Sequence, residues 1–262
     1  MKTLKCFKGL LLITLSIFSM QAFATPQQLL SNIHKLRLLS SESLINYYMY
    51  SGLDADSKYG KKVINSLGSF TKLLEDSRLL PAADGISDSL NEIDLNWVNF
   101  QKLMSINYND MEVQGFSDLR LVDEMGKTNA VLNKSLSKAY HDAQISSGTT
   151  PPAVVETARN LAMTMEEITA QYTARGTSSV VQVSTERTLE QMAVEFRTNL
   201  ARLKEQANLD SSSSILRSID SKWSFMERSI KNYNENTVPF LVASYSERII
   251  SNLEELVTMY DL

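Results

Sequence analysis

The stretch Leu90-Asn-Glu-Ile-Asp-Leu-Asn-Trp-Val-Asn-Phe-Gln-Lys-Leu-Met104 decides the fold class of this chain. Its large apolar residues follow one another in alternating steps of three and four, the spacing that gathers side chains on one face of an α-helix. The same spacing continues through nearly every segment, and no segment alternates cleanly as a strand, although 178–183 is locally ambiguous. We therefore predict an all-α protein with helices over residues 26–51, 55–79, 86–108, 117–144, 152–174, 185–208, 212–234 and 238–260.

The stretch also recurs later in the chain. A shift of 126 residues (223 minus 97) superimposes two Ile-Asp-x-x-Trp motifs, which end at Trp97 and Trp223 and contain both tryptophans of the chain. Near the start of each half, a shift of 124 (166 minus 42) aligns Glu42 with Glu166. Self-similarity at a nearly constant period indicates an internal duplication.

A polar segment separates the two copies. Residues 145–152 read Ile-Ser-Ser-Gly-Thr-Thr-Pro-Pro, and a helix does not continue through the proline pair. Each copy holds four long helices joined by short loops, which is typical of an up-and-down four-helix bundle. We predict two tandem up-and-down four-helix bundles, with the first repeat at 25–146 and the second at 147–262.

Local sequence also predicts some helix ends. Thr25-Pro26-x-Gln28 offers an N-cap, a proline in the first turn and a capping-box partner. Gly52 and Gly176 each follow the first helix of their half, where a left-handed cap residue is expected.

The N-terminus has the pattern of a secretory signal peptide over residues 1–24. Lys2, Lys5 and Lys8 precede an apolar run over 10–18, and a small-residue cleavage site follows it. We expect cleavage after Ala24 rather than an uncleaved anchor, because the apolar run is shorter than the roughly 20 residues of a membrane span. The mature protein is then expected to be soluble, and periplasmic if the source is a diderm bacterium.

Composition excludes several classes of function for such a mature chain. The only cysteine is Cys6, inside the signal, so a thiol nucleophile, a disulfide framework and a zinc-thiolate site are excluded. The signal removes three lysines, which leaves 26 minus 3, or 23, basic residues against 30 acidic ones and a net charge of −7. An acidic chain without a basic tract is a poor nucleic-acid binder, so we expect no nucleic-acid partner.

The first predicted helix resembles that of a family of periplasmic sensor domains. The run Lys35-Leu-Arg-Leu-Leu-Ser40, followed by Tyr47, is similar to the arginine-containing box of type IV pilus methyl-accepting chemotaxis transducers (PilJ-like) and nitrate sensors (NarX-like). The second arginine of the family's box falls on Glu42 here. The resemblance implies a duplicated, stand-alone sensory bundle that passes a signal to a membrane-bound or envelope protein.

The same resemblance implies a ligand site on the first helix, formed by Arg37, Ser40, Tyr47 and Tyr48. The guanidinium of Arg37 could hold a small anion or metabolite between helices or across a homodimer. Two alternatives stay open: an exposed arginine whose stem covers apolar neighbours, and a tyrosine cluster that closes the end of the bundle with its hydroxyls in water.

Trp97 and Trp223 could gate aromatic pockets, but their place in the apolar stripe favours core packing. We take them, with Asp94 and Asp220, as structural markers of the repeat. The two aspartates could meet an indole N–H or cap a loop.

No catalytic or cofactor motif is apparent. His34 and His141 are the only histidines, without an H-x-x-x-H or E-x-x-H pair, and we expect both to be exposed. We therefore predict no enzyme activity, no metal and no cofactor. The leading hypothesis is a periplasmic sensory or ligand-binding protein that modulates a membrane partner, and the alternative is a structural or adaptor protein of an envelope complex without a small ligand.

Overall fold

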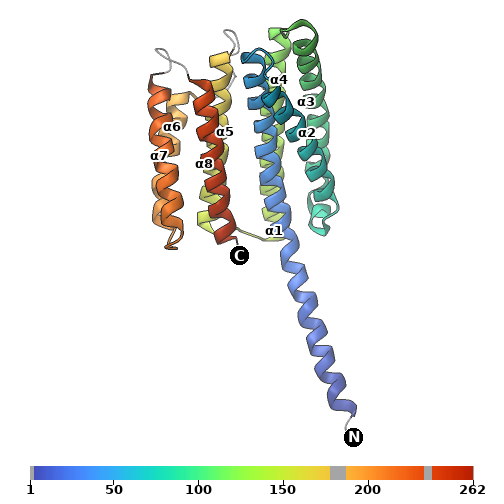
Figure 1. Ribbon diagram of the computed structural model, residues 1–262. Coiled ribbons are helices and arrows are strands. Elements are labelled where there is room, and N and C mark those ends of the chain that lie inside the picture. Colours follow the sequence, from blue (N-terminus) through green and yellow to red (C-terminus); the bar gives the residue numbers. More distant parts are fainter. Residues whose placement is uncertain (1–2, 178–186, 233–237, 262) are drawn as a thin grey trace.

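A computed structural model describes residues 3–177, 187–232 and 238–261, with side chains described from Pro26 onward. Within these residues all regular structure is helical and no strand occurs, which confirms the all-α class. The helices of Figure 1 are α1 (Thr3–Gly52), α2 (Ser57–Arg78), the 3-10 helix η1 (Pro81–Ile86), α3 (Ser87–Gln114), α4 (Leu119–Ser147), α5 (Ala153–Thr177), α6 (Leu189–Gln206), α7 (Ser212–Lys231) and α8 (Pro239–Tyr260).

Helices α2 to α8 overlap the ranges that the apolar spacing predicts, although α3 continues to Gln114 and not 108, and polar caps set several of their starts. The ambiguous segment 178–183 and the predicted helix ends at 185–186 and 233–234 lie outside the described residues. The side chains of Asp56 and Asp118 accept hydrogen bonds from backbone N–H groups in the first turns of α2 and α4. Thr188 and Gln191 form a reciprocal capping box at the start of α6. These caps satisfy N–H groups that have no acceptor inside the helix.

The predicted start of the first helix is wrong. Helix α1 begins at Thr3 and contains Pro26 in its interior, so Thr25 is not an N-cap. A proline keeps a helical φ and removes one backbone hydrogen bond, and the helix continues past it here. Cleavage after Ala24 stays a prediction, and it would place Pro26 in the first turn, where proline is favoured.

The two predicted glycine caps are also wrong. Gly52 is the last residue of α1, and the left-handed residues after it are Asp54 and Ala55, with φ of 51° and 61°. Gly176 lies within α5, where an added Cβ would be 2.5 Å from Cγ of Pro239. The glycine therefore permits a close approach between α5 and the start of α8.

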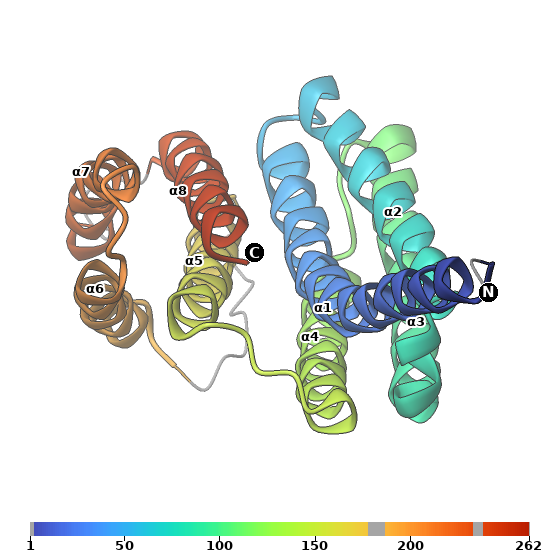
Figure 2. The same cartoon turned by 90° about the horizontal axis from the view of Figure 1, so that it is seen from below.

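Two buried apolar clusters form the interior. The first is built almost entirely from α1, α2, α3 and α4, which we call the first half, with Ala174 and Ala243 at its edge. The second comes from α5, α6, α7 and α8, the second half. Figure 2, which looks along the helices, shows the two halves as separate groups side by side.

Contacts between α1 and α5 join the halves, and α8 adds a smaller contact with α1. Successive helices run in opposite directions, so α1 and α5 point the same way (Figure 1). Residues at equivalent positions of these two helices can therefore meet at the same level across the junction.

The two halves repeat the same tertiary contacts. The rings of Phe70 and Trp97 stack with centroids 3.8 Å apart, and those of Phe196 and Trp223 lie 4.2 Å apart. Both members of the second pair are shifted by 126 residues from the first. Equivalent helices thus pack through equivalent aromatic residues.

Ion pairs recur in the same register. Asp94 pairs with Arg78 of α2, and Asp220 pairs with Lys204 of α6 at 2.7 Å. Here too both positions differ by 126. The aspartates thus bind basic residues of the preceding helix, and neither of the roles expected for them, binding an indole N–H or capping a loop, is found.

Candidate functional site

A cavity of about 450 Å³ lies between the two halves. We call it the junction cavity. Helices α1 and α2 line one side, and α5 and α8 line the other. Its lining residues are Lys35, Leu38, Leu39, Glu42, Ile45, Asn46, Lys62, Leu73, Glu166, Thr169, Ala243, Ser246, Glu247, Ile250 and Ser251.

Three carboxyl groups face this cavity, from three different helices. Glu42 lies on α1, Glu166 on α5 and Glu247 on α8. Glu247 pairs with the ammonium of Lys62, and Asn46 donates a hydrogen bond of 3.5 Å to Glu42. Glu166 is 5% exposed, and among the described residues its carboxyl group has no hydrogen bond or ion pair.

The surroundings of Glu166 strongly favour its protonated form. Burial raises the pKa of its carboxyl group well above the ordinary value, and the nearby charges of Glu42 and Glu247 raise it further. Burial also raises the pKa of Glu42, where the ammonium of Lys62 opposes the effect. Of the two glutamates that the repeat aligns, Glu42 therefore disfavours the charge of Glu166.

Arg37 borders other cavities of the same junction. It lines a cavity of about 440 Å³ together with residues of α4 and α5, and a more polar one of about 270 Å³ next to α6. Its guanidinium carbon lies 5.7 Å from the ring centroid of Tyr140, and its Nε is buried without an acceptor among the described residues. Arg37 is therefore half-buried at the junction and is not an exposed arginine.

The other predicted ligand residues do not line these cavities with Arg37. Ser40 is fully buried, and its hydroxyl accepts a 2.8 Å hydrogen bond from Asn129. The hydroxyl of Tyr47 lies 2.6 Å from that of Ser117, inside the first half. Tyr48 is 2% exposed, and its hydroxyl has no partner among the described residues. The three side chains belong to the core, so the structure does not gather the four residues into one site.

The tyrosine cluster also differs from the expectation of hydroxyls in water. Tyr47, Tyr48 and Tyr50 are all buried, and Tyr50 donates a 2.5 Å hydrogen bond to Glu112. Its ring stacks on that of Tyr108 with centroids 4.8 Å apart. Burial raises the pKa of Tyr47 to about 12. The cluster therefore packs helices α1 and α3 together.

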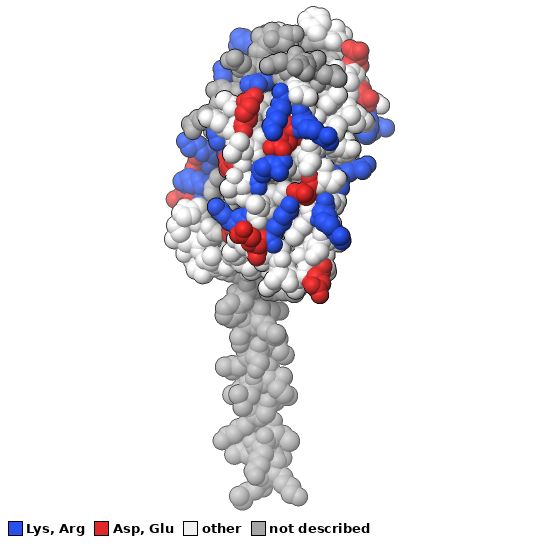
Figure 3. All heavy atoms as spheres, turned by 90° about the vertical axis from the view of Figure 1, so that its left-hand side faces the viewer, with Lys and Arg blue, Asp and Glu red and all other residues white. Residues whose placement is uncertain are grey.

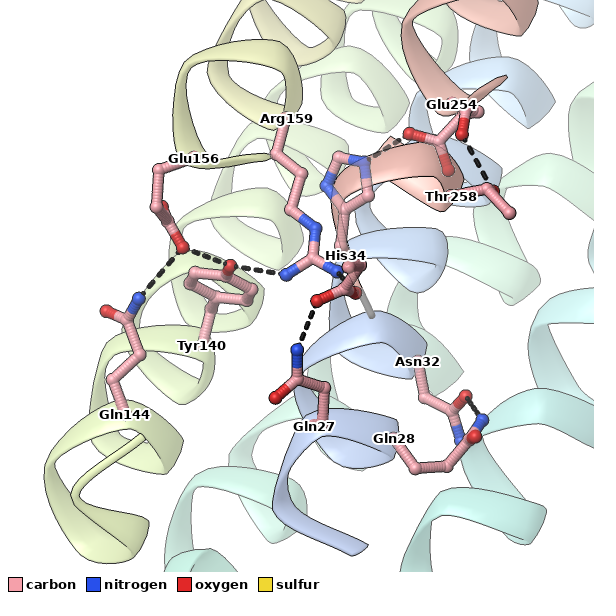
Figure 4. A network of polar contacts seen from close by, with 11 residues as sticks. Gln27, Gln28, Asn32, His34, Tyr140, Gln144, Glu156, Arg159, Glu254 and Thr258 are labelled. Atoms are coloured by element: carbon pink, nitrogen blue, oxygen red, sulfur yellow. Dashed lines mark hydrogen bonds and ion pairs between the residues drawn. The ribbon is translucent and has the colours of Figure 1, made fainter. Parts of the chain in front are cut away.

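A polar network crosses the junction near the other end of α1 (Figure 4). The guanidinium of Arg159 is 1% exposed, pairs with Asp261 at 2.8 Å and donates a 2.9 Å hydrogen bond to the hydroxyl of Tyr140. That hydroxyl donates to Glu156 at 2.6 Å. The network joins α4, α5 and the residue that follows α8, and Gln27 of α1 also donates to Asp261.

His34 belongs to the same region. It is 1% exposed, against the expectation of an exposed residue, whereas His141 is exposed as expected. Its Nε2 lies 2.8 Å from Oε1 of Glu254, and its Nδ1 is buried without a partner among the described residues. Burial lowers the pKa of His34, which the bond to Glu254 opposes, so the neutral ring donates through Nε2.

The tryptophans that mark the repeat are core residues. Trp97 is 3% exposed and Trp223 is fully buried. Nε1 of Trp97 donates to Oγ1 of Thr71 at 3.2 Å, whereas Nε1 of Trp223 is buried without an acceptor among the described residues. Both rings fill the interior of their half.

The outer face of the second half carries charges of both signs (Figure 3). Arg197 pairs with Glu227 there, as Lys204 does with Asp220. On this face acidic side chains interrupt the basic ones.

Sequence reasoning missed five titratable residues at the junction: Glu42, Glu166, Glu247, His34 and Arg159. Glu166, His34 and Arg159 are buried there, Glu42 is half-buried and Glu247 is exposed. One signal was present, because the repeat aligns Glu42 with Glu166. Glu42 also stands where the resembled family has its second arginine. The placement of the other three at the junction depends on which faces of α1, α5 and α8 meet, and helical spacing does not specify this.

In the part of the chain whose placement is described, no three His, Cys, Asp or Glu residues are arranged to hold a metal ion. No helix there is both long and apolar enough to cross a membrane. Comparison with protein-family models, with curated proteins and with solved structures found no match to this chain.

Proposed function

We propose that this protein is an exported sensory or ligand-binding protein that modulates a membrane-bound partner, and that its ligand occupies the junction cavity. One observation carries the proposal: Glu166 is buried at this cavity with no partner among the described residues. Burying an ionisable group without a partner destabilises a fold, and such groups are concentrated at functional sites.

The size and lining of the cavity support the proposal. Its volume of about 450 Å³ falls within the range of sites for small organic molecules. Apolar side chains such as Leu38, Leu39 and Ile250 surround a few polar groups, the usual composition of a ligand pocket. Its place between two packed units is also a common one for ligands.

We further propose that the two halves are tandem four-helix bundles that arose by duplication, over residues 25–146 and 147–262. The support is the pair of equivalent contacts, from Phe70 to Trp97 and from Phe196 to Trp223, together with the two aspartate ion pairs in the same register. Amphipathic helices match one another by period alone, but matching tertiary contacts require the same packing.

A ligand at this junction would act on how the two halves pack. It would contact α1 and α2 on one side and α5 and α8 on the other, and would favour the arrangement in which it makes both sets of contacts. A partner that binds one arrangement better would then respond to the ligand. The resemblance of the first helix to PilJ-like and NarX-like sensor domains supports a partner in the membrane, and the signal-peptide pattern supports a periplasmic location.

A structural or adaptor role is the second candidate, and exposed apolar residues favour it. Leu95 and Val98, three residues apart on α3, are 70% and 61% exposed. Contiguous apolar groups on a surface often mark a protein contact. This role needs no small ligand.

Thermal unfolding of the purified chain against a panel of anions, amino acids, amines and sugars tests the proposal. A ligand at 100 times its dissociation constant should add about 2.7 kcal/mol to the free energy of unfolding. Ser251→Trp, which adds a large ring at an exposed position of the cavity rim, should abolish the shift. Ser213→Trp on the exposed face of α7 is the matched control and should keep it.

The two candidate functions give different results. A shift that Ser251→Trp removes and Ser213→Trp keeps establishes a ligand site at the junction. No shift with any compound would overturn the proposal, and stable co-purification of one envelope protein would then favour the adaptor role.

A further inference from the structure

We propose that the junction cavity takes an organic cation, a primary or secondary amine with an apolar body, whose ammonium group binds the carboxylate of Glu166. This rests on the proposed function, since it names the chemical class of the ligand for the same cavity. The burial of Glu166, the charges around it and the lining of the cavity support this class of ligand.

Glu166 is positioned to bind a ligand from the cavity. Its side chain lines the junction cavity and also the cavity of about 440 Å³ beside α4, so it lies where α1 and α5 meet. It is 5% exposed, and no described residue donates a hydrogen bond to it. A buried carboxylate needs donors or an opposite charge, and the protein offers neither.

The charges that act on Glu166 are of its own sign, those of Glu42 and Glu247, and both disfavour its ionisation. The basic residues that line the same two cavities form no hydrogen bond or ion pair with it: Lys35, Arg37, Lys62, Lys134 and Arg187. Lys62 lines the cavity, but its ammonium is paired with Glu247. An ammonium group from a ligand would therefore meet one uncompensated carboxylate and a second, Glu42, nearby.

The rest of the cavity suits an apolar body better than a second charge. Leu38, Leu39 and Ile250 come from both halves and line it. Hydroxyl groups of Thr169 and Ser246 lie at the same wall, already joined by a 2.7 Å hydrogen bond. An anion would face three carboxyl groups, and of the two lysines in the lining, Lys35 and Lys62, the second is already paired with Glu247.

Ligand binding and proton release are coupled in this arrangement. Burial and the neighbouring carboxylates keep a proton on the free Glu166 far above the pH at which an exposed glutamate loses it. An ammonium donates hydrogen bonds to the ionised carboxylate, so an amine displaces this proton when it binds. A ligand that binds elsewhere would not displace it.

Isothermal titration calorimetry of the full chain tests the assignment, with phenethylamine and N-methylphenethylamine as cationic probes, a primary and a secondary amine. 2-Phenylethanol and 3-phenylpropanoate supply the same ring with no charge and with a negative charge. The amines should bind about tenfold or more tightly than the matched alcohol and carboxylate. Only the amines can form a charge-assisted hydrogen bond with the buried carboxylate of Glu166. Titration in buffers of different ionisation enthalpy should show proton release on amine binding.

Two variants make the result specific. Glu166→Gln keeps the shape of the side chain and should weaken amine binding about tenfold or more and abolish the proton release. Glu205→Gln makes the same change at an exposed position of α6 and should alter neither the affinity for the amine nor the proton release.

Amine binding that survives Glu166→Gln, or that releases no proton, overturns the assignment. Binding of the alcohol, the carboxylate or another compound at the cavity, without amine binding, overturns the amine class but leaves the ligand-binding function standing, whereas no binding by any compound overturns both.

Discussion

Glu42 of α1 and Glu166 of α5 are equivalent residues of the two halves, and both line the cavity where the halves meet. Each is stabilised in its protonated form by burial, and the charge of Glu42 raises the pKa of Glu166. The proposed duplication would explain why two like charges meet at the junction.

Glu166→Gln should stabilise the protein at high pH. A carboxyl group whose pKa is raised by folding contributes stability at low pH, where it keeps its proton, and loses that contribution as the pH rises from its ordinary value of 4.5 through its folded value. The variant should gain about 1.4 kcal/mol for each unit by which the pKa is raised. Thermal unfolding at pH 8 should show the gain, and unfolding at pH 4 should show little difference.

Glu205→Gln supplies the control for this prediction, because Glu205 is exposed on α6. This variant should leave the midpoint temperature of thermal unfolding unchanged at both pH 4 and pH 8. A loss of stability in Glu166→Gln at pH 8 would mean that the ionised carboxylate has a partner in solution.

His34 should make the protein sensitive to acid. Its pKa is lowered from the ordinary value of 6.5 by burial, so the stability that its neutral ring contributes is complete above 6.5 and is lost as the pH falls toward the folded value. We expect a loss on the order of 1 kcal/mol by pH 5. His34→Gln keeps a donor for Glu254 and cannot be protonated, so it should remove this part of the loss.

Chemical denaturation between pH 5 and 8 measures the effect. His141→Gln, at an exposed histidine, should retain the acid sensitivity of the parent chain. If His34→Gln is just as acid-sensitive, another group carries the dependence.

The ion pair between Arg159 and Asp261 should stabilise the junction. The pair is 2.8 Å long, and the two side chains are 1% and 12% exposed. Asp261→Ala leaves a buried guanidinium without its anion, which costs about 3 kcal/mol or more. Urea denaturation should show that loss, although Asp261 lies beyond the last helix.

The double variant separates the cost of an unpaired charge from lost packing. Arg159→Met with Asp261→Ala removes both charges and should recover part of the stability lost in Asp261→Ala. A double variant less stable than Asp261→Ala alone would show that Arg159 acts mainly through Tyr140.

The helices were predictable from sequence, and the junction was not. Apolar steps of three and four fixed the places of α2 to α8, because each helix must bury one face. The repeated motif predicted that Trp97 and Trp223 occupy equivalent positions in the two halves. In the structure each ring packs against an equivalent phenylalanine, Phe70 or Phe196. Helical spacing does not predict which neighbouring helix packs against a further face of α1 or α5, and the junction depends on that packing.

The candidate site illustrates this limit of prediction from helical spacing. Arg37 was singled out from a resemblance, and it does lie at the junction, but Ser40 and Tyr47 on the same helix point into the core of the first half. Helical spacing shows which residues of one helix share a face, such as residues three apart. It does not show which residues of other helices that face contacts. Glu166 and Arg159 are charged residues that α5 buries at the junction, and because charged residues are rarely buried the sequence does not predict this.

The last prediction concerns Trp97 and Trp223, which pack alike and differ in one hydrogen bond. Nε1 of Trp97 donates to Thr71 at 3.2 Å, and Nε1 of Trp223 has no acceptor among the described residues. Replacement by phenylalanine shrinks the ring equally at both positions. At Trp97 it also removes a hydrogen bond, and at Trp223 it removes an unsatisfied buried donor.

Trp223→Phe should therefore cost about 1 to 2 kcal/mol less than Trp97→Phe in urea denaturation. Each variant keeps a single tryptophan, so its fluorescence reports on one half while circular dichroism reports on the whole chain. Coincident transitions from the two signals would show that the halves unfold together and that the two costs can be compared directly. The two rings pack alike, so both variants should lose the same apolar contacts. If the transitions coincide and the two variants lose equal free energy of unfolding, the indole N–H of Trp223 has an acceptor in solution.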